Sequence, residues 1–185
     1  FRLSSVDYKR GLMKRFLVIT IIIFNVLLYT GCTKNTEYKT EYADNNYITI
    51  NKNKDDELVI PKENITNIAT FINYVVDDTT IQLIAVRGTD GEVRISFNTC
   101  NVCNPSPNAY FKQVGEYLEC QNCGNRFHID ELGSDSTGCN PMTVKEKKET
   151  ETTITLKEEY VTSLKSKFLH WQGPTKKDMQ VNAYN

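Results

Sequence analysis

Two C-x-x-C pairs with sixteen residues between them constrain the fold of this chain more than any other feature of its sequence. The first pair is Cys100 and Cys103, and the second is Cys120 and Cys123. A two-residue spacing lets one tight loop direct two sulfur atoms at the same point, and two such loops supply a tetrahedron of thiolates. We therefore predict one metal site, of a kind that suits zinc, iron or an iron-sulfur cluster.

The composition is that of an ordinary soluble domain, with a net charge of -1 from 22 basic and 23 acidic residues. This balance gives no sign of a nucleic-acid-binding surface. The sequence also contains no glycine-rich phosphate loop, no nucleophile elbow and no cluster of paired carboxylates. We therefore expect an electron-transfer or metal-binding protein rather than a catalyst.

The N-terminal part has the layout of an export signal. After an upstream extension of residues 1–12, Met13 and two basic residues precede an apolar run over residues 16–29, which is short for a membrane span. Residues 28–32 resemble the lipobox of bacterial lipoproteins, so residues 13–32 are predicted to be a signal peptide with lipid attachment at Cys32. Tyr29 departs from that pattern, which leaves an uncleaved anchor helix as the alternative. Either anchor implies a location at the cell membrane, with the rest of the chain on the extracytoplasmic side.

A polar tether over residues 33–46 leads to a domain predicted to cover residues 47–170 and to be mainly β (α+β), with small antiparallel sheets. Asp90-Gly91 and Gly115-Glu116 are hairpin signals, and they place each cysteine loop at the end of a strand. The charged run 145–151 is predicted to be a solvated loop and residues 152–156 an edge strand. The four-residue spacing of Tyr160, Leu164 and Phe168 indicates a short C-terminal helix, followed by a flexible tail over residues 171–185.

Four segments together resemble the FtrD-like family of membrane-associated iron-sulfur proteins. They are Asp90-Gly91, the two C-x-x-C pairs with Gly124 and Phe127 after the second, and Gly138-Cys139-Asn140-Pro141. Their order matches the family from about Leu58 to Phe168, although members often carry an acidic residue at the position of Asn98. The resemblance implies a membrane-linked protein with an iron-sulfur centre, associated in some bacteria with ferrous iron uptake through a permease.

The second cysteine loop also resembles a cluster loop of the Rieske proteins, with Cys103 and Cys123 in place of the two histidine ligands. The domain is accordingly expected to be Rieske-like or zinc-ribbon-like. Four thiolates carry more negative charge than the mixed site, so the potential should lie closer to the roughly -400 mV of plant-type ferredoxins. Gly124 is expected to let backbone amides approach a sulfur and Phe127 to shield the cluster from water, or both merely to shape a turn and fill the core.

Other interpretations of the cysteines stay open. The spacing alone favours a structural zinc ion, a single iron ion is a further alternative, and disulfides would leave one of five mature cysteines unpaired. Cys139 is the fifth thiol. It can be a ligand in one redox state, a reversible disulfide partner of Cys103 or Cys120, or a small buried group in its turn. The two histidines, His128 and His170, are not expected to be ligands.

Two classes of function follow. The first is a membrane-anchored, extracytoplasmic iron-sulfur protein that transfers electrons for ferrous iron uptake or another redox system, with a redox or iron-permease partner. The second is a binding module of the cell envelope that is held together by structural zinc.

Overall fold

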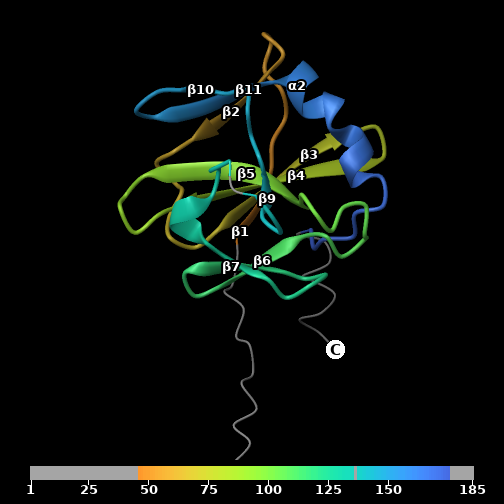
Figure 1. Ribbon diagram of the computed structural model, residues 1–185. Helices are drawn as coiled ribbons and strands as arrows, with labels where there is room; N and C mark the ends of the chain where they lie inside the picture. The colour runs from red at the N-terminus through yellow and green to blue at the C-terminus, as the bar shows by residue number, and fades with distance from the viewer. Residues whose placement is uncertain (1–45, 136, 176–185) are drawn as a thin grey trace, which may run out of the picture. The chain divides into compact units, whose positions relative to one another are not determined.

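Three β-sheets form the part of the chain that the computed structural model describes, which is residues 46–135 and 137–175 (Figure 1). The central sheet has five strands in the order β1-β3-β4-β5-β9, and it lies between two three-stranded sheets, β10-β11-β2 and β6-β7-β8. The predicted extension, signal or anchor segment, Cys32 and nearly all of the tether lie outside the described residues.

Two of the three sheets take their strands from separate parts of the chain. The central sheet is built from β1 (Asn46–Thr49), β3 (Thr70–Val76), β4 (Thr79–Arg87), β5 (Val93–Cys100) and β9 (Pro141–Thr143). One outer sheet is built from β2 (Glu57–Pro61), β10 (Lys148–Glu149) and β11 (Thr153–Lys157). The other is built from β6 (Phe111–Val114), β7 (Tyr117–Cys120) and β8 (Arg126–His128). Three helical turns complete the set, η1 (Ile129–Glu131), α2 (Glu158–Ser163) and η2 (Lys165–Phe168).

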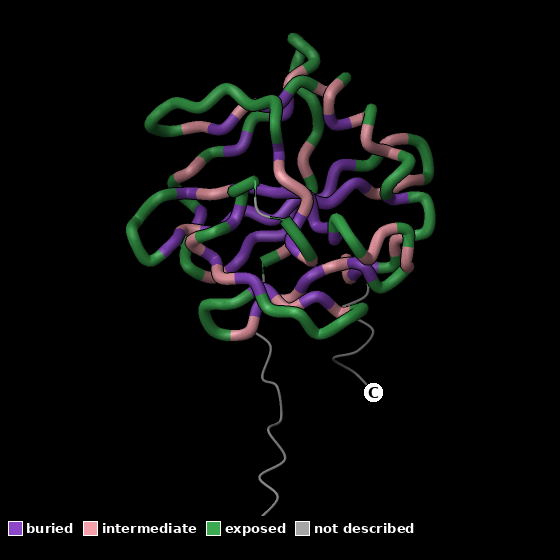
Figure 2. The backbone as a smooth tube through the Cα atoms, viewed as in Figure 1, coloured by how far each residue is buried: buried purple, intermediate pink, exposed green. Residues whose placement is uncertain are grey.

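The central sheet is covered on both faces, and the sequence of β4 shows why. Residues 81–86 of this strand are all buried, so their pattern is a continuous apolar run interrupted only by Gln82 rather than an alternation (Figure 2). Because successive side chains point to opposite faces of a sheet, Ile81 and Leu83 pack in one core and Ile84 in the other. A strand buried on both faces loses the polar side that a half-exposed strand would keep.

The two cores differ in what closes them. On one face, β2 and β11 bring large apolar residues such as Leu58 and Leu156 against the sheet, and Phe168 of η2 completes the core. We call this the apolar layer. On the other face, the β6-β7-β8 sheet packs Phe111 and Leu118 against the central sheet in a core that also contains cysteines. We call this sheet, together with the cysteine loops, the thiol layer.

Both predicted hairpins are present. Gly91 has φ +86° in the turn between β4 and β5, and Gly115 has φ +58° in the turn between β6 and β7. Left-handed backbone of this kind is strained for residues that carry a Cβ atom, so the glycines fix where the strands reverse. The second hairpin returns the chain from the first cysteine loop to the second.

Strand pairing departs from the sequence prediction in two places. The expected sheets are antiparallel, but β1 pairs with β3 in parallel, while the other pairings are antiparallel. The predicted edge strand, β11, is instead the middle of its sheet, because part of the charged run forms β10 and takes the edge. Charged residues such as Lys148 and Glu149 suit an edge, since they oppose further strand addition.

The C-terminal helix is shorter than its spacing predicts. α2 ends at Ser163, and a 3-10 turn, η2, continues the chain. The hydroxyl groups of Thr162 and Ser163 donate to the carbonyl oxygens of Glu158 and Tyr160, at 2.8 and 2.6 Å. Such back-bonding competes with the regular helical ladder, which explains the early change of pitch. Within residues 46–135 and 137–175 no helix has the length and apolarity needed to cross a bilayer.

Candidate metal centre

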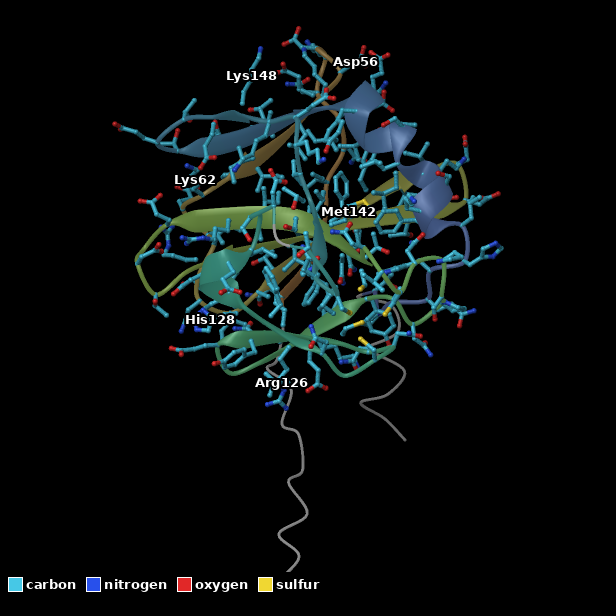
Figure 3. All side chains as sticks on the ribbon, viewed as in Figure 1. Asp56, Lys62, Arg126, His128, Met142 and Lys148 are labelled. Carbon is cyan, nitrogen blue, oxygen red and sulfur yellow. The ribbon has the colours of Figure 1, made fainter. Side chains whose placement is uncertain are left out.

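Three segments that lie far apart in the sequence bring five cysteines to one end of the central sheet. Cys100 is the last residue of β5, Cys120 is the last residue of β7, and Cys139 stands in the turn before β9. The other two, Cys103 and Cys123, follow their partners by three residues in the two loops. In Figure 3 sulfur atoms gather beside β6, at the side of the domain away from the labelled His128.

The two C-x-x-C loops are built alike. In the first, the backbone N–H of Asn104 donates to the carbonyl oxygen of Cys100 at 3.1 Å, and the N–H of Cys103 points at the Cys100 sulfur at 3.4 Å. In the second, the N–H of Gly124 donates to the carbonyl oxygen of Cys120 at 2.8 Å, and Gly124 has φ +74°. These turns hold each pair of sulfurs on the same side of its loop, as the spacing predicts.

The sulfur atoms are close enough to share one centre. The Sγ atoms of Cys100, Cys103, Cys120 and Cys139 all lie within 4.8 Å of one another. Cys139 Sγ is 3.0 Å from Cys100 Sγ and 3.7 Å from Cys103 Sγ, and it is 2.9 Å from Cys123 Sγ. Three of the four predicted thiols, Cys100, Cys103 and Cys120, therefore lie in one group with Cys139, and the fourth, Cys123, lies beside Cys139.

Exposure to solvent changes steadily across the cluster. Cys100 and Cys120 are fully buried in the core of the thiol layer, Cys103 and Cys139 are partly buried, and Cys123 is exposed. Val102, at the tip of the first loop, has a relative exposure of 65%. The cluster thus has one side against the protein core and one side at the surface.

The thiols influence one another's protonation. The neighbouring Cys100 sulfur and burial raise the pKa of Cys120, and burial also raises the pKa of Cys139. A hydrogen bond from Cys139, helped by the backbone N–H of Asn125, lowers the pKa of Cys123 to about 7. Deep thiols that resist ionisation need a cation to displace their protons, because only the thiolate is a good ligand.

Buried amide side chains support the first cysteine strand. Asn98, fully buried two residues before Cys100, accepts a hydrogen bond from the Phe111 backbone N–H at 2.7 Å and donates to Gln82 at 2.6 Å. Gln82 in turn donates to Asn73 at 2.7 Å. This network ties β5 to the start of the β6-β7 hairpin, so it fixes both cysteine strands relative to each other.

The C-terminal residues from η2 onward also contact β5 and the segment that carries the first cysteine loop. Trp171 Nε1 donates to the carbonyl oxygen of Asn98 at 2.7 Å, and the Gln172 N–H donates to that of Pro107 at 2.9 Å. Asn104 donates from its side chain to the carbonyl oxygen of Lys167 at 2.7 Å. Residues 171–175, which the sequence assigns to a flexible tail, therefore belong to the structured domain. The lone tryptophan of the chain, Trp171, was the sequence signal that this segment is ordered, since a large indole usually finds a buried contact.

The remaining singled-out residues lie in different places. Phe127 is 8% exposed and shares its core with Cys100 and Cys120. His128 instead contacts the ring of Tyr117, and its Nδ1 accepts a hydrogen bond from the Asp130 N–H at 3.2 Å. The structure thus places His128 in an arrangement separate from the thiols.

The protein-family comparison agrees with this geometry. Residues 62–168, more than half of the chain, match the model of the family described as membrane iron-sulfur containing protein FtrD-like. The matched segment contains all five clustered cysteines. Neither the curated proteins nor the solved structures compared with the chain gave a match. On the match over residues 62–168, this chain belongs to the FtrD-like family of membrane iron-sulfur containing proteins.

Proposed function

We propose that this protein is an extracytoplasmic iron-sulfur protein, anchored to the membrane, that transfers electrons for ferrous iron uptake or for another redox system. Family membership supports the iron-sulfur centre and the membrane association. The export layout of residues 13–32 supports the side of the membrane and the anchor, either lipid on Cys32 or an uncleaved helix. A redox protein or an iron permease is the proposed partner.

The residues present suit such a centre. Thiolates alone ligate most iron-sulfur clusters, and the described chain gathers five cysteine sulfurs at one point. When bound, the cluster supplies a one-electron couple. The chain itself buries the inner side of the site, excludes water there through Phe111 and Phe127, and directs the Cys103 N–H at the Cys100 sulfur. Hydrogen bonds to sulfur and burial are the means by which a protein tunes the potential of a cluster.

The gradient of exposure is the observation that carries the electron-transfer proposal. A structural metal site does not need an edge near the surface, whereas a centre that exchanges electrons with a partner does, because transfer rates fall steeply with distance. Here Cys100 and Cys120 are fully buried, while Cys103 and Cys139 are only partly buried and Val102, beside Cys103, is 65% exposed. A surface edge beside a shielded interior fits a centre that is held firmly and is reached by another protein.

A second candidate, a module held together by one structural zinc ion, is favoured by one observation. Four thiolates around a single zinc ion at about 2.3 Å would lie about 3.8 Å apart. Four of the sulfurs in this site lie within 4.8 Å of one another, which is close to that spacing. A cluster with two or more irons spreads its ligands further, since bridging atoms stand between them. A single iron ion would fit the same spacing.

The deciding experiment is metal and acid-labile sulfide analysis, with an absorption spectrum, of the full chain purified in detergent without oxygen. The control is the Cys100→Ser and Cys120→Ser double variant, which removes the two buried thiols. Iron with sulfide and visible absorption bands, both lost in the control, is the expected result. A reductive titration would then give the potential, which we expect near the roughly -400 mV of all-cysteine clusters. A colourless protein that binds one zinc ion would overturn the electron-transfer proposal.

The anchor has its own test. If Cys32 carries the lipid, Cys32→Ala in the full chain should abolish incorporation of a radiolabelled fatty acid. If an uncleaved helix is the anchor, the unmodified protein and Cys32→Ala should both stay associated with the membrane. Protease added to intact cells should digest the domain if it faces outward. Protection of the domain until the cells are lysed would contradict the proposed side of the membrane.

A further inference from the structure

Five thiols meet at a site that needs four. Zinc and iron bound by cysteine are four-coordinate, and cubane or two-iron clusters also take four cysteine ligands. The two C-x-x-C pairs already supply four, so the pattern by itself leaves Cys139 without a place. The positions of the five sulfurs indicate which of them is not a ligand.

The sulfur positions favour Cys139 over Cys123. Cys139 belongs to the group of four sulfurs that lie within 4.8 Å of one another, together with Cys100, Cys103 and Cys120. Cys123 is not a member of this group, although it lies 2.9 Å from Cys139. Cys123 is also the exposed thiol of the five, whereas Cys139 is partly buried. Of these two thiols, Cys139 is thus the one that is better shielded from solvent.

The backbone around Cys139 is fastened to both cysteine loops. The Asn101 N–H, in the first loop, donates to the carbonyl oxygen of Asn140 at 3.1 Å. The side chain of Asn125, after the second loop, donates to the carbonyl oxygen of Cys139 at 3.1 Å. Pro141 pairs with Cys100 in the central sheet. The turn that carries Cys139 is thus a third wall of the site, held in place by contacts that do not involve sulfur.

Glycine before Cys139 makes this placement possible. Gly138 has φ +112°, a backbone conformation that residues with a Cβ atom rarely adopt. The Asn140 N–H donates to the Gly138 carbonyl oxygen at 3.1 Å and closes a tight turn around the cysteine. The turn over residues 138–140 therefore directs the Cys139 sulfur inward, toward the Cys100 sulfur.

We propose that Cys139, with Cys100, Cys103 and Cys120, ligates the metal centre, and that Cys123 is an accessible fifth thiol outside the ligand set. This assignment rests on the proposed metal centre but not on whether the metal is iron or zinc. In the second C-x-x-C pair, the first cysteine, Cys120, then binds metal, and the second, Cys123, lies exposed beside the site.

Two matched variants test the assignment in the full chain, purified in detergent without oxygen. Cys123→Ser should keep close to the metal content and absorption spectrum of the unmodified protein. Cys139→Ser should lose most of its metal, at least about tenfold in affinity, as expected when one ligand of four is removed. The assignment is overturned if Cys139→Ser keeps its metal, or if Cys123→Ser loses it.

A footprint on the unmodified, metal-loaded protein avoids dependence on how the variants fold. Brief treatment with iodoacetamide, followed by peptide mass spectrometry, should alkylate Cys123 at least about tenfold faster than Cys139, because a metal-bound thiolate is protected. Equal protection of Cys123, or preferential alkylation of Cys139, would overturn the assignment. If the loaded metal is zinc, the electron-transfer proposal fails while the same footprint still decides the ligand set.

Discussion

The apolar layer and the thiol layer cover opposite faces of one central sheet, yet their cores differ in composition. In the apolar layer, strands β2 and β11 contribute Leu58, Ile60, Ile154 and Leu156, each at most 1% exposed. In the thiol layer, the three strands of the outer sheet have three or four residues each, and fully buried cysteines stand among their apolar side chains. Buried amides and tight turns supply much of the remaining support.

This difference separates stability from function within one small domain. Burial of large aliphatic side chains gives the apolar layer stability that does not depend on conditions such as metal supply. The thiol layer brings five cysteines together, and their sulfurs bind metal only as thiolates. We therefore expect that the ordered structure of the thiol layer depends on bound metal. The apolar layer should keep the central sheet folded when the metal is absent.

Metal removal should give the largest contrast between the two layers. Chelation under reducing conditions should remove most hydrogen-exchange protection from residues 100–104 and 120–125, because the turns there lose their common centre. Protection in β2, β4 and β11 should remain. Hydrogen exchange measured by mass spectrometry, with and without chelator, checks this expectation. Uniform loss of protection throughout the domain would show that the two layers unfold together.

The second largest effect should come from a cavity in the apolar layer. It should lower the free energy of unfolding without changing the metal content. Leu156→Ala, at a fully buried position of β11, should lower the free energy of unfolding by about 2 to 5 kcal/mol. The same change at Leu169, which is 59% exposed, is the control and should cost little. Urea unfolding gives both values. Metal loss from folded Leu156→Ala would contradict the independence of the layers.

The amide network should matter to both stability and the site. Asn98→Ala removes the acceptor of the Phe111 N–H and the donor to Gln82, and leaving such buried groups unpaired should cost about 1 to 3 kcal/mol. We also expect a measurable loss of metal affinity, because Asn98 aligns β5 with the β6-β7 hairpin. Asn108→Ala, at an exposed asparagine between the first cysteine loop and β6, is the matched control. Equal effects of the two substitutions would rule out the network as the support.

The smallest expected effect is a pH dependence at the hairpin between β4 and β5. The hydroxyl and N–H of Thr89 donate to the Asp130 carboxylate at 2.6 and 2.7 Å, and they lower the pKa of that carboxyl below its ordinary value of 3.8. A lowered folded-state pKa contributes stability that is present above the ordinary pKa and is lost as the pH falls through the lowered value.

Asp130→Asn should therefore be less stable than the unmodified protein near neutral pH, and the difference should shrink below about pH 4. Thermal unfolding of both proteins across this range measures it. The exposed Asp78→Asn serves as the control. A difference that grows as the pH falls would refute the role of the carboxylate.

Local patterns determined a large part of this protein. Strand positions and the two hairpins follow from runs of β-branched residues and from glycines at Gly91 and Gly115, which act over a few neighbouring residues. The C-x-x-C spacing fixed two thiols on each loop for the same reason. These features, with the Gly138-Cys139 turn, also identified the family. The Rieske-like or zinc-ribbon-like architecture stays a prediction.

Only the tertiary structure decided which distant residues meet. Part of the charged run forms edge strand β10 because β11 offers it a pairing partner. Trp171 donates to the carbonyl oxygen of Asn98, 73 residues earlier in the chain. Cys139 lies 36 residues after Cys103 in the sequence, yet the two sulfurs are 3.7 Å apart. No local preference encodes such contacts. They arise when burial on both faces of the central sheet fixes β5, β7 and β9 together, and the sulfur cluster is the result.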